Sequence, residues 1–165
     1  MAKASARREW STDYTGPPPD VKVASSRYNA PLMVLILSPA QYASLLAQAE
    51  AERPDEACGL LAGAAGQVRR VYPVENIAHS PTAYEVNPSG QVAAFLDMEA
   101  SGWELCGIYH SHPTGPAVPS PTDIAKAYYP EAVYIIISPD ASGAWQARGF
   151  EIVDGQVREV ALEVR

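Results

Sequence analysis

The sequence predicts a single domain of the α/β class, with an α+β-like arrangement in which two main helices sandwich a mixed or antiparallel curved β-sheet. A chain of 165 residues can bury one hydrophobic core without a disulfide framework. Short apolar runs of strand length alternate with two longer segments whose apolar residues recur at helical spacing. Near the end of the chain, Asp154-Gly155 separates two strand candidates and is a strong hairpin signal.

The first 31 residues differ in composition from the rest of the chain. They contain three consecutive prolines, Pro17–Pro19, together with scattered Ser and Thr, and they offer little apolar surface that folding could bury. We therefore expect residues 1–31 to be a flexible tail and residues 32–165 to form the domain. The alternative is that aromatic side chains of the tail dock on a neighbouring surface; the candidates are Trp10, Tyr14 and Tyr28.

The first elements of the domain are predicted to be a strand and a helix. Leu32–Leu37 is a short apolar run of strand length. Ser38 followed by Pro39 is typical of a helix N-cap and a first helical residue, and Pro54 ends this helix. Apolar residues at positions i, i+3, i+4 and i+7 share one face of the helix; they are Tyr42, Leu45, Leu46 and Ala49.

A hairpin and a second helix follow. Cys58–Ala62 is predicted to be a buried strand that turns near residues 63–66 and pairs with Gln67–Val74. A loop rich in Pro, Ser and Asn then spans Asn76–Asn87. Helical spacing in Gln91–Ala100 predicts a helix whose apolar face contains Val92, Phe95 and Leu96.

The second half of the domain is predicted to consist mostly of strands. Leu105–Tyr109 is an apolar strand that ends at His110, and Asp123–Tyr129 is a short helix stopped by Pro130. The remaining strand candidates are Val133–Ser138, Trp145–Val153 and Gln156–Val164, the last two on either side of the hairpin turn.

Charge and hydropathy argue against several classes of partner. The formal net charge is -7 and the Lys and Arg residues are not clustered, so a nucleic-acid surface is not expected. The longest apolar run is far shorter than the roughly 20 residues of a membrane span, and no apolar stretch follows the basic N-terminus as in a secretory signal. Cys58 and Cys106 are expected to be small buried side chains in a reducing compartment. These features predict a cytoplasmic protein with no nucleic-acid or membrane partner.

The most informative segment is His110-Ser111-His112-Pro113, which a proline-braced loop connects to Asp123. Alternate residues of an extended chain point to the same side, so both imidazoles can aim at one point. Asp123 begins the next predicted helix and can fold back to add a carboxylate oxygen. Two imidazoles and one carboxylate, with a fourth position left for water, are typical of a catalytic zinc site, whereas structural sites use four protein ligands. We therefore predict one zinc ion held by these three side chains.

A single histidine usually has a surface or structural role, and His79 in the loop is assigned to that class. His110 and His112 differ because they are two of only three histidines in the chain and stand at a strand terminus. A Pro-Ser-x-x-Asp segment follows them, and a chance match to the whole pattern is improbable.

These residues resemble the JAMM motif of the MPN+ (Mov34/PAD-1) metalloproteases. The residues in register with the motif are His110, His112, Ser120 and Asp123. The family also carries a glutamate shortly before a Cys-Gly pair on an earlier strand, and Glu56 is its counterpart here. The resemblance covers roughly residues 32–165. It is strongest to the compact bacterial and archaeal branch, which includes Mec-type hydrolases that act on a ubiquitin-like sulfur carrier.

The resemblance implies a single MPN/JAB-type domain and a zinc peptidase that cleaves the amide bond after the C-terminal glycine of a ubiquitin-like protein or sulfur-carrier adduct. Zinc lowers the pKa of a bound water to near 7, and a carboxylate outside the metal shell must take the proton and pass it to the leaving amine. The resemblance assigns this general-base role to Glu56. Ser120 is expected either to donate a hydrogen bond to the oxyanion or to cap the following helix. Thr122 is the better-placed cap for a helix that begins at Asp123.

Two alternatives remain at the level of sequence. RadC proteins share an HxHP…PSxxD pattern on a related fold, but their usual text is HNHPSG, whereas this chain has HSHPTG and the peptidase-type strand after Glu56. Many MPN domains bind no zinc and act as scaffolds, but those have lost ligand residues that this chain keeps. The predicted partner is therefore the C-terminal tail of a ubiquitin-like or sulfur-carrier protein. We expect it to lie beside the Asn76–Asn87 loop, where Tyr84 and Val86 could form an apolar wall.

Overall fold

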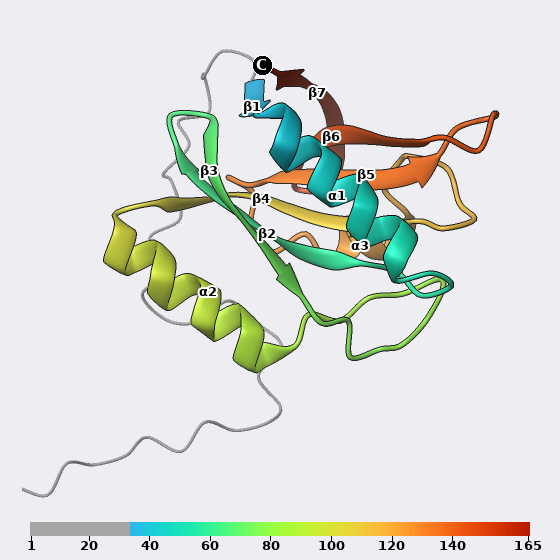
Figure 1. The fold of residues 1–165 in the computed structure, drawn as a ribbon, viewed down its shortest axis with the longest axis horizontal. Helices are drawn as coiled ribbons and strands as arrows, with labels where there is room; N and C mark the ends of the chain where they lie inside the picture. The colour runs from blue at the N-terminus through green and yellow to red at the C-terminus, as the bar shows by residue number, and fades with distance from the viewer. Residues whose placement is uncertain (1–33) are drawn as a thin grey trace, which may run out of the picture.

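The computed structural model describes residues 34–165, in which seven strands close into a β-barrel flanked by helices (Figure 1). The predicted tail, residues 1–31, and the docking of its aromatic residues lie outside the described residues, and both stay predictions. The first two positions of the strand predicted over Leu32–Leu37 lie outside them too, and the rest of that strand is confirmed.

The strands pair in the order β1-β3-β2-β4-β5-β6-β7, and β7 pairs with β1 to close the barrel. Their bounds are β1 Val34–Leu37, β2 Cys58–Ala64, β3 Gln67–Val74, β4 Glu104–Ser111, β5 Val133–Pro139, β6 Trp145–Val153 and β7 Gln156–Val164. The β1–β3, β1–β7 and β4–β5 pairs are parallel and the others antiparallel. The sheet is therefore mixed, and the wholly antiparallel alternative is wrong. The sequence did not predict closure, which joins the two ends of the domain.

Helix α1 (Pro39–Ala51) begins where the sequence predicted. The Ser38 hydroxyl accepts a hydrogen bond from the Gln41 N–H at 3.2 Å, while the Gln41 side chain accepts one from the Ser38 N–H at 2.8 Å. This capping box satisfies backbone donors that a helix start leaves free. Leu45 and Ala49 are fully buried beneath the helix, so the predicted apolar face is the face that packs on the sheet.

Helix α2 (Pro88–Ser101) is longer than predicted and is turned differently about its axis. Its buried residues are Ala94, Phe95 and Met98, whereas Val92 is 47% exposed and Leu96 is 61% exposed. The prediction that Val92 and Leu96 share the buried face is wrong. A physical reason lies at Gly90, where a Cβ atom would come within 2.8 Å of Val74 Cγ1. This close approach fixes which side of α2 faces β3.

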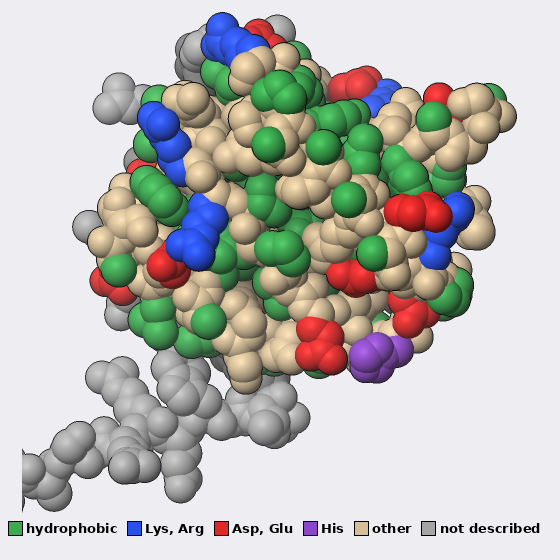
Figure 2. All heavy atoms as spheres, in the orientation of Figure 1, with side chains coloured by type: hydrophobic (Ala, Val, Ile, Leu, Met, Phe, Trp, Pro, Cys, Tyr) green, Lys and Arg blue, Asp and Glu red, His purple; other side chains and the backbone are tan. Residues whose placement is uncertain are grey.

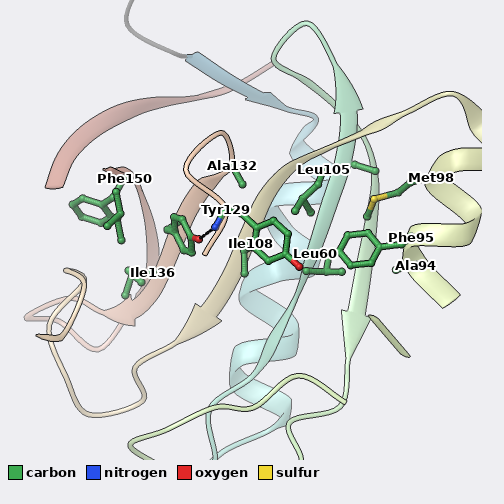
Figure 3. Packing of buried hydrophobic residues seen from close by; sticks show 13 residues of the cluster. Leu60, Ala94, Phe95, Met98, Leu105, Ile108, Tyr129, Ala132, Ile136 and Phe150 are labelled. Carbon is green, nitrogen blue, oxygen red and sulfur yellow. Dashed lines mark hydrogen bonds between the residues drawn. The ribbon is translucent and has the colours of Figure 1, made fainter. Parts of the chain in front are cut away.

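Neighbouring residues of the central strands point to opposite faces of the sheet, and each face carries its own hydrophobic cluster. Leu60 belongs to the cluster that α2 covers, together with Phe95 and Met98 (Figure 3). The next residue, Leu61, belongs to the cluster that α1 covers, together with Leu45. The two main helices therefore sandwich the sheet, as predicted, and β2 and β4 lie between them (Figure 1).

The short third helix, α3 (Pro121–Ala125), begins and ends earlier than predicted. Ser120 is its N-cap and Pro121 its first residue, so the prediction of Thr122 as the cap is wrong. A proline lacks the N–H that a first helical position leaves unpaired, so it fits that place. The predicted end at Tyr129 is also wrong, because the helix ends at Ala125. The Tyr129 N–H lies beyond it and donates to the Tyr134 hydroxyl at 2.9 Å (Figure 3).

The surface and the helix lengths add two further facts. On the face drawn in Figure 2, the Lys and Arg side chains are scattered among acidic and apolar ones. Among residues 34–165, no helix combines the length and the hydropathy needed to cross a bilayer.

The turned face of α2 gives a stability prediction. Phe95→Ala should lower the free energy of unfolding by about 3–5 kcal/mol, because it removes a buried aromatic ring and leaves a cavity. Leu96→Ala on the same helix should change it by less than about 0.5 kcal/mol, since that side chain is largely in solvent. Urea denaturation of the two variants measures both values, and equal losses would contradict the observed orientation of α2.

Candidate metal centre

His110 and His112 occupy same-side positions of extended chain at the end of β4. His110 is fully buried and lies opposite Cys58 of β2. The His112 N–H donates to the Ile137 carbonyl at 2.8 Å, which carries strand-like pairing past Ser111. The Nε2 atoms of the two rings are 3.0 Å apart. The strand thus continues past His110, where the sequence predicted its end, and both imidazoles point to one place as expected.

Asp123 reaches the same place from the first turn of α3. Its Oδ1 atom is 3.3 Å from His110 Nε2 and its Oδ2 atom is 3.4 Å from His112 Nε2. The Ser120 N–H donates to Oδ2 at 2.6 Å, so the capping box of α3 also orients the carboxylate. One ligand atom from each of the three residues can be chosen so that all lie within 4.8 Å of one another. The structure therefore brings together the three side chains predicted to bind metal.

The arrangement of these three side chains suits a zinc ion. Ligand atoms about 2.0–2.1 Å from one zinc ion at tetrahedral angles lie about 3.3 Å apart, close to the separations observed. His112 Nδ1 lies 2.9 Å from the Pro116 carbonyl, which can only accept, so Nδ1 carries the proton. His112 Nε2 then presents its lone pair toward His110 and Asp123, as a metal ligand must. Lone pairs and a carboxylate that converge in this way call for a cation or a proton between them.

The surroundings of His110 and Asp123 favour the protonation states that bind a cation. Burial lowers the pKa of His110, which favours the neutral imidazole. Burial by itself would raise the pKa of Asp123, but hydrogen bonds with His110 and His112 outweigh it and hold that pKa well below its ordinary value. A neutral imidazole and an ionised carboxylate are the forms that metal binding requires.

Glu56 lies beside the three ligands but outside their group. Only 4% of the residue is exposed, and burial is the main cause that raises its pKa from 4.5 to about 7. The charge of His112 lowers the pKa and that of Asp123 raises it, which shows how near Glu56 is to both. A carboxyl group with a pKa near 7 can both accept and return a proton at neutral pH.

Ser120 is an N-cap in this structure, which was the second of its two expected roles. Its hydroxyl oxygen accepts from the Asp123 N–H at 3.2 Å. A hydroxyl that accepts one hydrogen bond can still donate its own proton. Because Ser120 also lines the cleft described below, the cap leaves its donor available to a bound molecule.

Cys58 packs beside this site and shows no sign of reactivity. The residue is fully buried, and its Sγ atom donates to the Val74 carbonyl at 3.4 Å. Burial raises the pKa of its thiol to about 12, so the thiolate is strongly disfavoured at neutral pH. These observations agree with the packing role predicted for it.

A cleft of about 400 Å³ opens beside the three metal-ligand candidates. Glu56, His112 and Asp123 line it, and part of its wall is the segment of residues 81–84 from the long loop. The Tyr84 ring stacks on the His110 imidazole, with centroids 4.2 Å apart, so it forms the apolar surface predicted for it. Val86 does not line the cleft; it pairs instead with Asn76 in an isolated β-bridge.

Ser111 is a buried residue beside the centre to which the sequence reasoning assigned no role. Its hydroxyl accepts from the Ala57 N–H at 2.8 Å, and its own N–H donates to the Ala57 carbonyl at 2.9 Å. The residue after Glu56 is therefore tied to the residue between the two histidines. The sequence signal that could have pointed to Ser111 was the presence of a hydroxyl side chain between the two histidines of the HxH pattern.

Comparison with known proteins bears on what this centre is. Residues 38–149 match the family described as prokaryotic homologs of the JAB domain. The chain belongs to this family. That membership confirms the resemblance to the JAMM/MPN+ proteins and to their prokaryotic branch.

Several curated relatives carry peptidase names. The CysO-cysteine peptidase of Mycobacterium tuberculosis is 36% identical over 133 residues, which are 79% of this chain and 91% of the relative. The desampylase of Haloferax volcanii is 43% identical over 119 residues, 70% of this chain and 83% of the relative. A probable TtuB-protein conjugate cleaving protease of Thermus thermophilus is 43% identical over 114 residues, 68% of this chain and 71% of the relative.

Solved structures support the fold. A protein from Desulfitobacterium hafniense, determined in solution, is 35% identical with a TM-score of 0.71, and the match covers 81% of this chain and 93% of that one. A JAB1/MPN domain protein from Archaeoglobus fulgidus is 22% identical with a TM-score of 0.50, covering 79% of this chain and 97% of that one. The barrel with its flanking helices is thus the JAB/MPN fold.

The raised pKa of Glu56 predicts a pH-dependent cost in the metal-free protein. The folded chain holds this proton up to about pH 7, whereas the unfolded chain releases it near 4.5, so stability should fall as pH rises between these values. Glu56→Gln removes that cost and should stabilise the metal-free protein by roughly 1–3 kcal/mol at pH 8. At pH 4 the two proteins should be equally stable. Denaturation in the presence of a chelator measures the difference, and a pH-independent difference would contradict the assignment.

Proposed function

We propose that this protein is a zinc-dependent peptidase that cleaves the amide bond after the C-terminal glycine of a ubiquitin-like protein or sulfur-carrier adduct. The observation that carries the proposal is the meeting of His110, His112 and Asp123 at one point of a cleft that also contains the buried carboxyl group of Glu56. We further propose that it acts in the cytoplasm, in keeping with the two free cysteines.

The substrate class rests on similarity to relatives. One relative is named a CysO-cysteine peptidase and another a probable protease that cleaves TtuB-protein conjugates. These names describe proteins joined to a second group, so the natural substrate of this chain is a carrier protein linked through its C-terminus. The partner is then the carrier's tail, and the leaving group is an amine.

The roles of the side chains follow from their positions. His110, His112 and Asp123 would hold one zinc ion, which when bound supplies a Lewis acid that lowers the pKa of water to near 7. Glu56 takes the proton from the attacking water and passes it to the leaving amine. Ser120 donates its hydroxyl proton to the oxyanion that develops on the scissile carbonyl, while its oxygen keeps the cap of α3.

The shape of the cleft favours an extended tail with small side chains. Residues 81–84 form one wall, and Tyr84 lies against a metal-ligand candidate, so a bulky residue next to the scissile bond would have to pack against this wall. An extended peptide can be bound through its backbone, in the manner of an added β-strand. Glycine at the end of the tail suits such a site.

The two alternatives are less well supported. A scaffold without zinc has no use for three converging ligands and a carboxyl group buried beside them, because burying these groups unpaired is costly. The relatives described above do not support the RadC-like alternative, because they are named as a peptidase, a desampylase and a probable protease.

Glu56→Gln should abolish turnover while leaving zinc bound. The amide keeps the size of the carboxyl group but cannot accept a proton, and general-base catalysis is worth about 10²–10⁴ in rate. Metal analysis and a hydrolysis assay on the same preparation measure both properties. Retention of most of the activity with zinc bound would rule out Glu56 as the base.

The substrate itself provides a second test. Replacing the penultimate glycine of the carrier tail with a bulky residue should lower kcat/KM by roughly 100-fold or more, because a displaced scissile bond reacts slowly. Substitutions on the carrier's globular surface should have much smaller effects. A free tail peptide cleaved as efficiently as the intact conjugate would instead favour a general small-peptide hydrolase.

A further inference from the structure

Asn76, the second residue after β3, is a buried side chain that sequence reasoning left without a role. The residue is 5% exposed. Its Nδ2 atom donates to the Glu56 carbonyl at 2.9 Å and to the Ala83 carbonyl at 3.1 Å. Its Oδ1 atom accepts from the Ala78 N–H at 3.0 Å and from the Glu85 N–H at 2.9 Å. The two donors and two acceptor sites of the amide are all used.

These contacts join two parts of the cleft that are far apart in sequence. The Glu56 N–H donates to the Ser80 carbonyl at 2.9 Å. The N–H and the carbonyl of Glu56 are therefore both bonded to the Asn76–Asn87 loop, the first to Ser80 and the second to the Asn76 side chain. The Ala83 carbonyl, held by the same amide, belongs to the wall formed by residues 81–84. A single side chain thus fixes the backbone that carries the base and the wall that faces the substrate.

The three metal-ligand candidates are fixed by different partners. His112 Nδ1 donates to Pro116, and the Asp123 carboxylate accepts from the Ser120 N–H. His110 lies in the paired strands β2 and β4. The wall touches this group through the stacking of Tyr84 on His110. Ser111, between the two histidines, is bonded to Ala57 and not to Asn76. A change at Asn76 should therefore free the Glu56 and Ala83 carbonyls while leaving the partners of the metal-ligand candidates in place.

We propose that Asn76 is a positioning residue that holds Glu56 in place beside the three metal-ligand candidates and holds the cleft wall in one arrangement with it. The inference rests on the proposed function for its catalytic consequence. A substrate tail that binds against residues 81–84 then contacts a wall that is joined to Glu56 through Asn76. Recognition of the tail is therefore linked to proton transfer by Glu56.

Asn76→Asp tests this role because the side chains are nearly the same size. A carboxylate has no proton for the Glu56 and Ala83 carbonyls, and a protonated carboxyl group has one where the amide has two. Asn87→Ser is the control. Asn87 caps α2 by accepting from the Ser89 N–H, a role that serine performs equally well, and the bond that its amide donates to the Glu75 carboxylate is exposed.

The experiment compares kcat, KM, zinc content and the visible spectrum of the cobalt-substituted proteins. Asn76→Asp should lower kcat by roughly 100-fold and raise KM, with one metal ion per chain and an unchanged cobalt spectrum. Asn87→Ser should stay within about threefold of wild type. Loss of metal in parallel with activity, or activity of Asn76→Asp close to wild type, would overturn the proposal.

A measurement on the wild-type protein keeps the inference testable if the Asn76 variant does not fold. The side-chain NH₂ protons of Asn76 should exchange with solvent at least about tenfold more slowly than those of Asn87, since buried bonded groups open rarely. Equal exchange rates, measured by NMR, would show that Asn76 does not hold the Glu56 and Ala83 carbonyls. If wild-type protein hydrolysed no carrier conjugate, the proposed function would fall, while the exchange rates and cobalt spectra would still decide whether Asn76 holds Glu56 and the cleft wall independently of the metal.

Discussion

The structure depends on holding two imidazoles and a carboxylate at one buried point. His110 comes from β4, His112 directly follows that strand, and Asp123 comes from α3, so separate segments must meet within hydrogen-bond distance. Polar groups buried in this way destabilise a fold unless they are paired or bind a cation. Strand pairing on both sides of β4 fixes His110, and the bond from the His112 N–H to the Ile137 carbonyl fixes His112. The capping box of α3 fixes the aspartate.

The loop between the histidines and α3 is anchored from outside at several carbonyl groups. The Ser138 hydroxyl donates to Gly115 at 2.6 Å, and Arg53 donates to Pro113 at 3.2 Å. Arg148 donates to Ala117 at 3.3 Å. Since β5, β6 and the segment after α1 each supply one of these donors, the position of Asp123 depends on the assembled barrel. Such support from surrounding side chains is what a preorganised metal site requires.

Local signals in the sequence predicted the parts that depend on neighbours along the chain. Ser38-Pro39 located the start of α1, and Asp154-Gly155 located the hairpin, so the bounds of β6 and β7 were predicted as observed. The HxHP and Ser-x-x-Asp spacing placed all three ligand candidates, because alternation on a strand is a local rule.

Contacts between distant segments explain what the sequence could not predict. The rotation of α2 is limited by the approach of Gly90 to Val74, and no periodicity in the helix records that contact. Tyr129 lies beyond the end of α3, and its N–H is bonded to the Tyr134 hydroxyl on the far side of the next loop. The sequence does not distinguish Asn76 from other loop asparagines, because its bonding partners Glu56 and Ala83 come beside it only in the folded chain. Barrel closure likewise rests on pairing between the first and last strands.

X-ray absorption at the zinc edge, recorded on the purified protein, tests the central claim most directly. The account predicts one zinc ion per chain, with scattering from two imidazole rings, oxygen in the remaining positions and no sulfur. Protein that takes up no zinc, or zinc with a sulfur ligand from Cys58, would contradict it.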